Sequence, residues 1–254
     1  MRRVLAVGGS DSGGGAGLQA DLKTLHALGV HGSTVVTAVT AQDSVAVHHV
    51  HPVPPESVRA QLSAVLGDLG ADVVKTGMLA TEETVRVVAD AVAGLPLVVD
   101  PVGVSSSGQS LLSPDGLAAL RSLLLPLATV VTPNLAEVEA LTGFVVRAES
   151  DLEQAAERVL ALGPRWVLVK GGHLPGDPVD LLHDGTTVTA LRGPRLETPH
   201  THGTGCTLAS ALAAFLALGE QVPQAAARAK AFTAEAIRGG YPLGAGPGPV
   251  RPGG

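Results

Sequence analysis

One short segment places glycine, hydroxyl and thiol groups at the start of a predicted helix. Residues 201–207 are Thr-His-Gly-Thr-Gly-Cys-Thr, and they run directly into the apolar, alanine-rich stretch 208–218. Glycines let the backbone wrap closely around a ligand, and the free N–H groups of a helix N-terminus attract anions. The segment therefore predicts an anion-binding turn, suited to a phosphoryl group in transfer, whose members are Gly203, Thr204, Gly205 and Cys206.

Cys206 is the only cysteine of the chain. A helix N-terminus lowers the pKa of a thiol, so this position predicts an available thiolate. The alternative is a small core residue beside an ordinary tight turn, because free cysteine is among the most buried residue types. The segment alone leaves both interpretations open.

Polar groups that suit phosphate and metal chemistry follow other apolar runs. Asn134 and Glu137 lie three residues apart, on one face of the first turn of a predicted helix. Both can act through water and Mg²⁺ on a triphosphate, or they can simply cap the helix. Asp100, at the end of a predicted strand, is a second candidate near the metal. Lys170 closes another apolar run, from which it can reach a phosphate.

The glycine-rich loop of residues 8–17 follows the first predicted strand. It is longer and more polar than a dinucleotide-binding G-x-G-x-x-G turn, and the acidic residue expected after a second strand is missing. The sequence also has no G-x-x-x-x-G-K-[ST] motif of a P-loop. We interpret the loop as the lining of a small-molecule pocket.

Short apolar runs alternate with helical patterns along the chain, which is typical of an α/β protein. Strands are predicted at residues 4–7, 33–39, 72–76, 97–99, 129–131 and 166–169. The first predicted helix has Leu18, Leu22 and Leu25 on one face, and the second begins at Pro55 and has the apolar stripe Val58, Leu62, Val65 and Leu69. Two further helices are predicted to begin near Thr81 and at Asn134. The others cover residues 114–124, 151–162, 204–218 and 223–238. The pattern predicts a mainly parallel, doubly wound sheet.

Two local signals add detail to this prediction. Ser150 and Glu153 have the spacing of a capping box at a helix start. Asp184 and Gly185 predict a hairpin turn between residues 181–182 and 188–191, which adds a small antiparallel part to the sheet. Ligands of such sheets bind beyond the carboxyl ends of the strands. We expect six polar segments to converge there, at residues 8–17, 40–43, 77–78, 100–101, 132–134 and 170–173.

Length and composition limit the classes of protein. A chain of 254 residues without a linker predicts one domain over residues 1–254, with a biased tail at 239–254 that can be partly loose. The net charge of −6 comes without a charged run and aromatic residues are 2%, so neither nucleic acid nor a membrane surface is an expected partner. The apolar runs are too short for a signal peptide or a membrane span, which predicts a cytoplasmic protein.

Cysteine and histidine usage limits the metal and disulfide chemistry. A single cysteine excludes an intrachain disulfide, and the chain has no cysteine and histidine spacing of a structural zinc site. His48, His49 and His51 lie close together, but alternation along a strand favours a solvated or lid strand over a metal site.

Over nearly its whole length, the chain resembles the hydroxymethylpyrimidine/phosphomethylpyrimidine kinases of thiamin biosynthesis, within the ribokinase-like superfamily. The matching segments are Gly9-Ser10-Asp11, residues 16–24, Thr40-Ala41-Gln42, residues 75–79, 99–102 and 132–137, Val169-Lys170-Gly171-Gly172-His173, and residues 201–207. The resemblance implies a three-layer α/β/α fold, ATP as phosphoryl donor, Mg²⁺ and a homodimer. It also implies two transfers, first to the hydroxymethyl oxygen of 4-amino-5-hydroxymethyl-2-methylpyrimidine and then to the resulting phosphate.

The resemblance assigns roles to the polar groups. The superfamily commonly has an aspartate base at the end of its anion hole, and this branch has cysteine there, which corresponds to Cys206. The turn from Gly203 to Cys206 would stabilise the moving phosphoryl group, and Lys170 would neutralise ATP oxygens. The nucleotide-binding set is Asn134, Lys170 and Thr204, and the metal set is Asp100 and Glu137.

A second set is expected to bind the pyrimidine. The amide of Gln42 offers both a donor and an acceptor to an aminopyrimidine edge. The resemblance adds Gly9, Ala16, Asp21, Met78 and Val102 to that pocket. Asp21 has a rival role as an anchor of the loop, and Met78 is a core residue by its type alone.

The chain also departs from the family pattern. Gly103 and Ser106 stand where relatives commonly have Met and Lys, so a basic contact can be missing from this loop, and Asp43 replaces a frequent Asn after Gln42. The alternative function is a pyridoxine or pyridoxal kinase, because close relatives share the motifs. A third reading of the same pocket is a catalytically silent vitamer-binding module.

Overall fold

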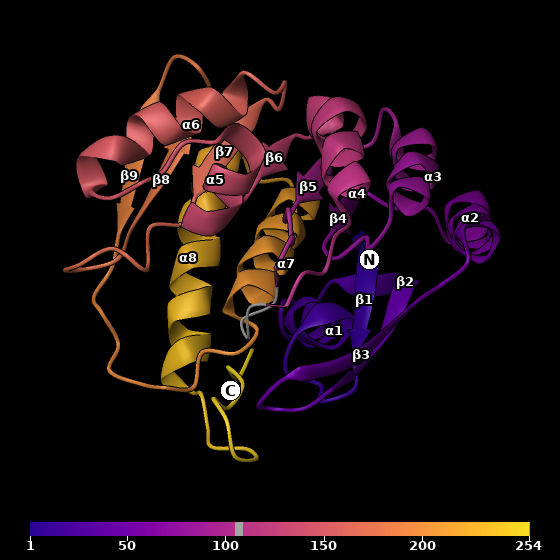
Figure 1. Cartoon of the computed structure of the whole chain (residues 1–254), viewed down its shortest axis with the longest axis horizontal. Coiled ribbons are helices and arrows are strands. Elements are labelled where there is room, and N and C mark those ends of the chain that lie inside the picture. The colour runs from indigo at the N-terminus through magenta and orange to yellow at the C-terminus, as the bar shows by residue number, and fades with distance from the viewer. Residues whose placement is uncertain (105–108, 254) are drawn as a thin grey trace.

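The computed structural model describes residues 1–104 and 109–253 and contains one nine-stranded sheet (Figure 1). The strands are β1 (Arg3–Asp11), β2 (His31–Gln42), β3 (Val47–Pro52), β4 (Val73–Thr76), β5 (Leu97–Val99), β6 (Val130–Val131), β7 (Trp166–Val169), β8 (Val179–His183) and β9 (Val188–Arg192). Their order is β3-β2-β1-β4-β5-β6-β7-β8-β9. The six strands from β2 to β7 in this order are parallel, and β3, β8 and β9 are antiparallel to their neighbours. The predicted mainly parallel sheet with an antiparallel addition is confirmed.

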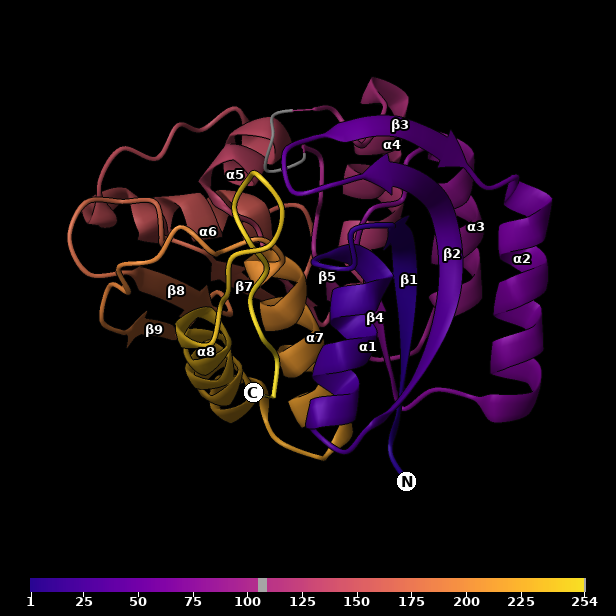
Figure 2. The same ribbon diagram turned by 90° about the horizontal axis from the view of Figure 1, so that it is seen from below.

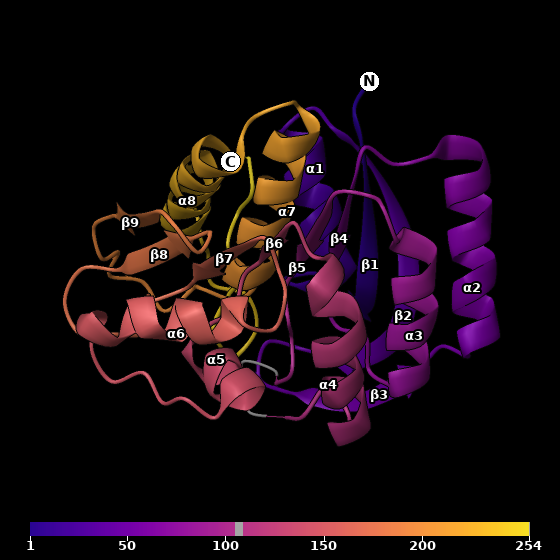
Figure 3. The ribbon, with the colours of Figure 1, turned by 90° about the horizontal axis from the view of Figure 1, so that it is seen from above.

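Helices cover both faces of the sheet. They are α1 (Gly17–Ala27), α2 (Pro55–Ala64), α3 (Glu82–Val92), α4 (Pro114–Ala119), α5 (Leu135–Thr142), α6 (Leu152–Leu160), α7 (Thr204–Ala217) and α8 (Val222–Arg238). Single π-helical turns, Val65–Leu69 and Leu120–Leu124, continue α2 and α4. Figure 3 shows α1, α7 and α8 on one side of the sheet and α2 to α6 on the other. These are the three layers expected of the ribokinase-like fold.

The central strands β1, β4, β5, β6 and β7 carry apolar residues on both faces, because both faces are covered there. Successive residues belong to different core clusters: Leu5 packs with the α2–α6 layer, and Val4 packs with the α1, α7 and α8 layer. Leu97 and Val99 likewise face the first layer, whereas Val98 faces the second. This alternation explains why the sequence shows continuous apolar runs that end abruptly at polar segments.

Three local expectations are wrong. Leu22 and Leu69 lie on predicted apolar helix faces but are 39% and 46% exposed. The side chains of Ser150 and Glu153 do not form a capping box, because a 3-10 turn at Glu149–Asp151 precedes α6. The carboxylate of Asp151 accepts the Arg147 and Ala148 N–H groups instead, and this fixes the chain ahead of the helix.

The described part of the C-terminal tail is held against the body of the protein. Val250 is buried and its N–H donates to the His202 carbonyl, and the Arg251 N–H donates to the Ala236 carbonyl. The Gly246 N–H donates to the hydroxyl of Ser44 in the turn between β2 and β3, where Figure 2 shows the tail passing. These hydrogen bonds connect Gly246, Val250 and Arg251 of the tail to the rest of the protein.

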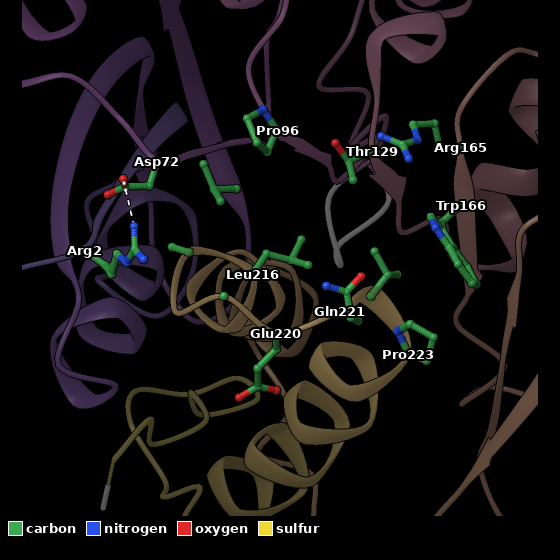
Figure 4. A pocket seen from close by; sticks show the side chains of 14 residues that line it. Arg2, Asp72, Pro96, Thr129, Arg165, Trp166, Leu216, Glu220, Gln221 and Pro223 are labelled. Atoms are coloured by element: carbon green, nitrogen blue, oxygen red, sulfur yellow. Dashed lines mark ion pairs between the residues drawn. The ribbon is translucent and has the colours of Figure 1, made fainter.

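A cavity of about 410 Å³ lies at the edge of the sheet where the parallel strands begin (Figure 4). Its lining includes Trp166 and an ion pair of 3.5 Å between Arg2 and Asp72. None of the candidate site residues that the structure describes lines it. In the described ranges, no helix has the combined length and apolar character that crossing a membrane requires.

Candidate active site

A second cavity, of about 190 Å³, lies at the carboxyl ends of the parallel strands. All six polar segments predicted to converge there contribute to it, together with the turn at the start of α7. The lining residues used below are Gly9, Asp11, Ala16, Asp21, Gln42, Lys75, Met78, Asp100, Val102, Asn134, Glu137, Lys170, His202, Gly203, Gly205 and Cys206. The sheet thus joins the expected pyrimidine set and, apart from Thr204, which does not line the cavity, the expected phosphate set in one site.

The turn that begins α7 is built by close backbone contact. Gly203 has a φ of +86°, and a Cβ at this position would lie 1.9 Å from the Gly15 carbonyl oxygen. The hydroxyl and N–H groups of Thr204 both donate to the Thr201 carbonyl, so Thr204 stabilises the turn itself. The N–H groups of Gly205 and Cys206 are left at the open end of the helix, where an anion can accept them.

Cys206 lines this cavity but is not a ready thiolate. Burial raises the pKa of its thiol to about 11, against the lowering influence of the Lys75 ammonium and of the Gly17 N–H. The ready thiolate expected from the helix N-terminus alone is therefore not favoured, because loss of solvation outweighs the favourable charges. The thiol still occupies the place in the turn where the family resemblance puts a base.

Lys170 lies between two carboxylates, that of Asp100, directly after β5, and that of Glu137, in the first turn of α5. Its Nζ is 2.8 Å from Asp100 Oδ1 and 3.6 Å from Glu137 Oε2. Burial raises the pKa of Glu137 to about 7, although the charge of Lys170 opposes this shift. The two carboxylates raise the pKa of Lys170 despite its burial, so the ammonium remains charged. This cluster offers one cation and two anionic groups to an incoming triphosphate.

The capping role and the metal role of the Asn134 and Glu137 pair do not exclude each other. Asn134 Oδ1 accepts the Glu137 N–H at 2.9 Å, and Glu137 Oε2 accepts the Asn134 N–H at 2.7 Å, which is a complete capping box. Within residues 1–104 and 109–253, the structure gives no hydrogen bond to Glu137 Oε1 or to Asp100 Oδ2. One oxygen of each carboxylate is thus left for water or a cation.

The titration of Glu137 predicts how stability depends on pH. Folding raises the pKa of Glu137 from its ordinary value of 4.5 to about 7, so the folded state binds more protons between these values. The free energy of unfolding should therefore fall as the pH rises through this window, and Glu137→Gln should lose that contribution. Urea midpoints of both proteins across the window test this. Parallel curves for the two would contradict it.

The expected pyrimidine side of the cavity is assembled mainly from β1, β2 and the segment after β4. Met78 is buried, and its sulfur lies 3.0 Å from the position of a Cβ at Gly9, so only glycine fits there without a shift. Val102 packs against the small cluster that contains Met78. The amide of Gln42 contacts the Thr40 hydroxyl at 3.3 Å and His202 Nε2 at 3.4 Å.

Asp21 does not present a free oxygen to this pocket. Its side chain is 1% exposed and both of its oxygens accept from Lys75 Nζ, at 2.8 and 3.0 Å. The hydroxyl of Ser210 donates to Asp21 Oδ1 at 2.7 Å. The structure therefore favours an interior role for Asp21, although not the loop anchor that was its rival in the sequence.

The loop anchor is Asp11, which sequence reasoning missed together with His202. The Asp11 carboxylate accepts the N–H groups of Gly13, Gly15 and Ala16 at 2.8 to 3.0 Å. His202 Nε2 lies 3.3 Å from Asp11 Oδ2. Burial raises the pKa of Asp11, but the His202 and backbone hydrogen bonds lower it more, so the net shift is downward. An aspartate followed by glycines is a turn signal that was present in the sequence.

The departures from the family pattern are only partly described. Gly103 lies in the segment after β5, where its carbonyl accepts the Leu111 N–H at 2.9 Å. Ser106 lies outside the described residues. Asp43 is exposed and accepts from His48 and from the backbone N–H groups of Val45 and Ala46, so it shapes the turn that leads into β3.

Comparison with known proteins agrees with this geometry. The family model described as phosphomethylpyrimidine kinase matches residues 11–251. The hydroxymethylpyrimidine/phosphomethylpyrimidine kinase of Streptomyces coelicolor is 58% identical over 249 residues, which cover 97% of this chain and 93% of that protein. The family model covers all of the cavity lining except Gly8, Gly9 and Ser10.

Solved structures of two related kinases have the same fold as this chain. An ADP complex of Bacillus subtilis pyridoxal kinase has a TM-score of 0.93 and 40% identity and covers 99% of this chain and 97% of its own. Phosphomethylpyrimidine kinase from Clostridium difficile has a TM-score of 0.82 and 38% identity, with 93% and 100% covered. By sequence and by structure, the chain belongs to the phosphomethylpyrimidine kinase family.

Proposed function

We propose that this kinase transfers the γ-phosphoryl group of ATP to the hydroxymethyl oxygen of 4-amino-5-hydroxymethyl-2-methylpyrimidine, and then a second one to the monophosphate, for thiamin biosynthesis. The observation that carries the proposal is the position of the α7 turn. It lies in one cavity with the Gln42 and Met78 side, where a small ring would bind, and with Lys170, Asp100 and Glu137, where phosphates would bind.

The residues of the site would act mainly by positioning and by stabilising charge. The N–H groups of Gly205 and Cys206 would bind the phosphoryl group as it moves, and Lys170 would neutralise the nucleotide phosphates together with Asn134 and Thr204 at the margins. Gly203 would keep the turn close to the glycine loop. The pyrimidine would be held by Gln42, Gly9, Ala16, Met78 and Val102. Asp21 would support this pocket through its ion pair with Lys75 and would not contact the ring.

The two carboxylates suit Mg²⁺ bound through water. Asp100 and Glu137 are hard oxygen donors, each with one oxygen that no described residue occupies, and Mg²⁺ commonly keeps several waters and few protein ligands. When bound, the ion would supply positive charge to the phosphates of ATP. It would also favour the ionised form of Glu137, whose pKa burial raises to about 7.

Cys206 has a proton to accept only in the first transfer. The hydroxymethyl group is a neutral alcohol, so its proton must leave as the new P–O bond forms, and the Cys206 thiolate can take it to become the thiol. In the second transfer a phosphate oxygen is already an anionic nucleophile. Replacing the sulfur should therefore affect the two steps unequally.

Cys206→Ala should slow the first transfer by about 10²-fold or more while the second falls by less than about tenfold, because general-base catalysis contributes on the order of 10²–10⁴. Single-turnover assays with the alcohol and with the monophosphate, each with MgATP, measure the steps separately. Cys206→Ser, which keeps a side chain of similar size but replaces the thiol by a far less acidic hydroxyl, is the matched control for packing and should lose the first transfer as Cys206→Ala does. Equal losses in both transfers would refute the assignment.

Pyridoxine or pyridoxal phosphorylation is the second candidate function. It is favoured by the 40% identity and TM-score of 0.93 to a pyridoxal kinase, since the two substrates share a hydroxymethyl group on a six-membered ring. A vitamer-binding module without catalysis is less well supported, because Lys170, Glu137 and Cys206 are all present in the cavity.

Mass spectrometry of the products separates these functions. The protein is incubated with MgATP and either the hydroxymethylpyrimidine or pyridoxine. A pyrimidine monophosphate followed by a diphosphate supports both transfers, and phosphorylation of pyridoxine alone supports the second candidate. Binding of either vitamer without turnover supports the silent module. The family resemblance further predicts a cytoplasmic homodimer, which sedimentation of the purified protein tests for its oligomeric part.

A further inference from the structure

A fully buried ion pair lies beneath the anion-binding turn. Lys75 comes from β4, Asp21 from α1, and their side chains are each 1% exposed. Lys75 Nζ lies 2.8 and 3.0 Å from the two oxygens of Asp21, and Ser210 from α7 donates to Oδ1 of the same carboxylate. Three elements therefore bring one cation, one anion and one hydroxyl to a single point.

This point is on the same face of α7 as the single cysteine. Ser210 follows Cys206 by four residues, which is about one helical turn, so the two side chains lie one above the other. Lys75, Asp21 and Cys206 all line the cavity at the carboxyl ends of the strands. The ammonium lies at the very end of β4, because a Cβ at Gly77 would be 3.2 Å from its nitrogen.

Stability alone does not explain a lysine at this place. The preceding residues of β4, Val73 and Val74, belong to the two core clusters. A buried ion pair loses so much solvation that well-packed apolar residues of similar volume are often as stabilising or more so. The buried charge of Lys75 therefore indicates a role beyond stability, in supporting a further charged group that takes part in the reaction.

Resting on the function proposed above, we propose that Lys75 is a positioning residue of the first phosphoryl transfer: held by Asp21 and Ser210, its ammonium stabilises the thiolate form of Cys206. The base of the reaction is then supported from inside the protein, on the side of α7 that faces the sheet. Lys170 and the open N–H groups of the turn would then act on the phosphates.

The charges around the thiol support this assignment. Burial raises the pKa of Cys206, and of the charges that act on it Lys75 has the largest effect and is the one that lowers it. Asp21 from α1 and Asp100 from the end of β5 act in the opposite direction. Lys170, beyond β7, also interacts electrostatically with Cys206. Asp21 thus has a double effect, since it opposes the thiolate directly but keeps the Lys75 ammonium charged and in place.

The test uses the thiol itself and needs no substrate. Because Cys206 is the only cysteine, alkylation by iodoacetamide reports on this one group. The rate is measured between about pH 6 and 10, where it rises with the thiolate fraction, so the rates of two variants at one pH compare their apparent pKa values, since only the thiolate reacts. The variant Asp21→Asn/Lys75→Met removes both charges together and so leaves no unpaired buried charge. The variant Asp21→Asn/Lys75→Gln is a polar second version.

Both double variants should alkylate at least about threefold more slowly than the wild type near pH 8, with a higher apparent pKa, because half a pKa unit changes the thiolate fraction about threefold. Lys230→Met is the control, since Lys230 pairs with Asp180 at 2.7 Å away from the cavity lining. It should alkylate at the wild-type rate. Thermal unfolding by circular dichroism verifies that each variant is folded.

Rates of the folded double variants within about 1.5-fold of the wild type would overturn the proposal, because a charge that supports the thiolate cannot be removed without effect on it. A rate lowered equally by Lys230→Met would overturn it too. The result is independent of the substrate: a lowered rate with no kinase activity on any pyrimidine would disprove the proposed function and leave the electrostatic role of Lys75 standing.

Discussion

Gly203→Ala should abolish most of both phosphoryl transfers. The added Cβ would lie 1.9 Å from the Gly15 carbonyl oxygen, and the backbone at Gly203 has a φ of +86°, where an L side chain is strained. Either the turn or the glycine loop must move, and the N–H groups of Gly205 and Cys206 move with it. A displacement of about 1 Å in a positioned site costs on the order of 10²-fold in rate, so we expect a loss of at least this size.

The control for this substitution is Gly219→Ala. Gly219 also has a positive φ, +98°, at the other end of α7, but a Cβ there meets no atom within 4 Å. It should lose stability by about 1–2 kcal/mol from backbone strain and keep its activity. Thermal unfolding and single-turnover rates of both variants separate strain from collision. Near wild-type activity of Gly203→Ala would show that the turn does not hold the reacting group.

The position of the site could be predicted because it follows from periodicity. Apolar runs of parallel strands end where the sheet ends, so the segments after β1, β4, β5, β6 and β7 had to lie at one edge. The bounds of β5 and β7 agree with the sequence prediction, because apolar side chains fill both faces of these strands. The extension of β1 to Asp11 was missed, since glycines that pair with β2 carry no apolar signal.

Contacts between distant residues could not be predicted from a single sequence. His202 and Asp11 are separated by 191 positions, and neither has a spacing that points to the other. The pair of Lys75 and Asp21 is separated by 54 positions, and its burial depends on α1 and α7 packing on the same face of the sheet. The sequence therefore could not show that the oxygens of Asp21 accept from Lys75 and Ser210.

The protonation of Cys206 shows a different limit. A cysteine at a helix N-terminus is visible in the sequence, and this position favours a thiolate. Solvent exclusion is not visible there, and it is the larger influence, raising the pKa to about 11. A sequence motif shows which groups lie together in a local turn. The sign of a pKa shift depends in addition on how much water the fold removes from those groups.

Lys170→Met should reduce both transfers strongly and to a similar extent. Among the described residues, Lys170 is the cation that lies between Asp100 and Glu137. Its Nζ is 2.8 Å from Asp100 and 3.6 Å from Glu137. Without it, two buried carboxylates would face the phosphates, and Glu137 would lose the charge that lowers its pKa. Removing a group that stabilises transition-state charge costs about 10²–10³-fold, so we expect a loss of this order in each step.

Lys230→Met is closely matched as a control. The Lys230 side chain is 15% exposed and its ammonium lies 2.7 Å from Asp180. The Lys170 side chain is 16% exposed and its ammonium lies 2.8 Å from Asp100. Both substitutions remove a cation that pairs closely with an aspartate, but only Lys170 has a second carboxylate, Glu137, beside it and lines the cavity. Single-turnover rates of both variants with the alcohol and with the monophosphate, beside unfolding curves, test the difference. Equal losses in the two variants would attribute the effect to stability.

The two transfers distinguish the lysine from the cysteine. Phosphates of the donor are present in both steps, so a group that acts on them must matter in both. A proton on the nucleophile is present only in the first, so a group that accepts it must matter there alone. A loss confined to the first step in Lys170→Met would mean that Lys170 supports the base instead of the phosphates. Charge stabilisation by the α7 turn would then have to act without a cation.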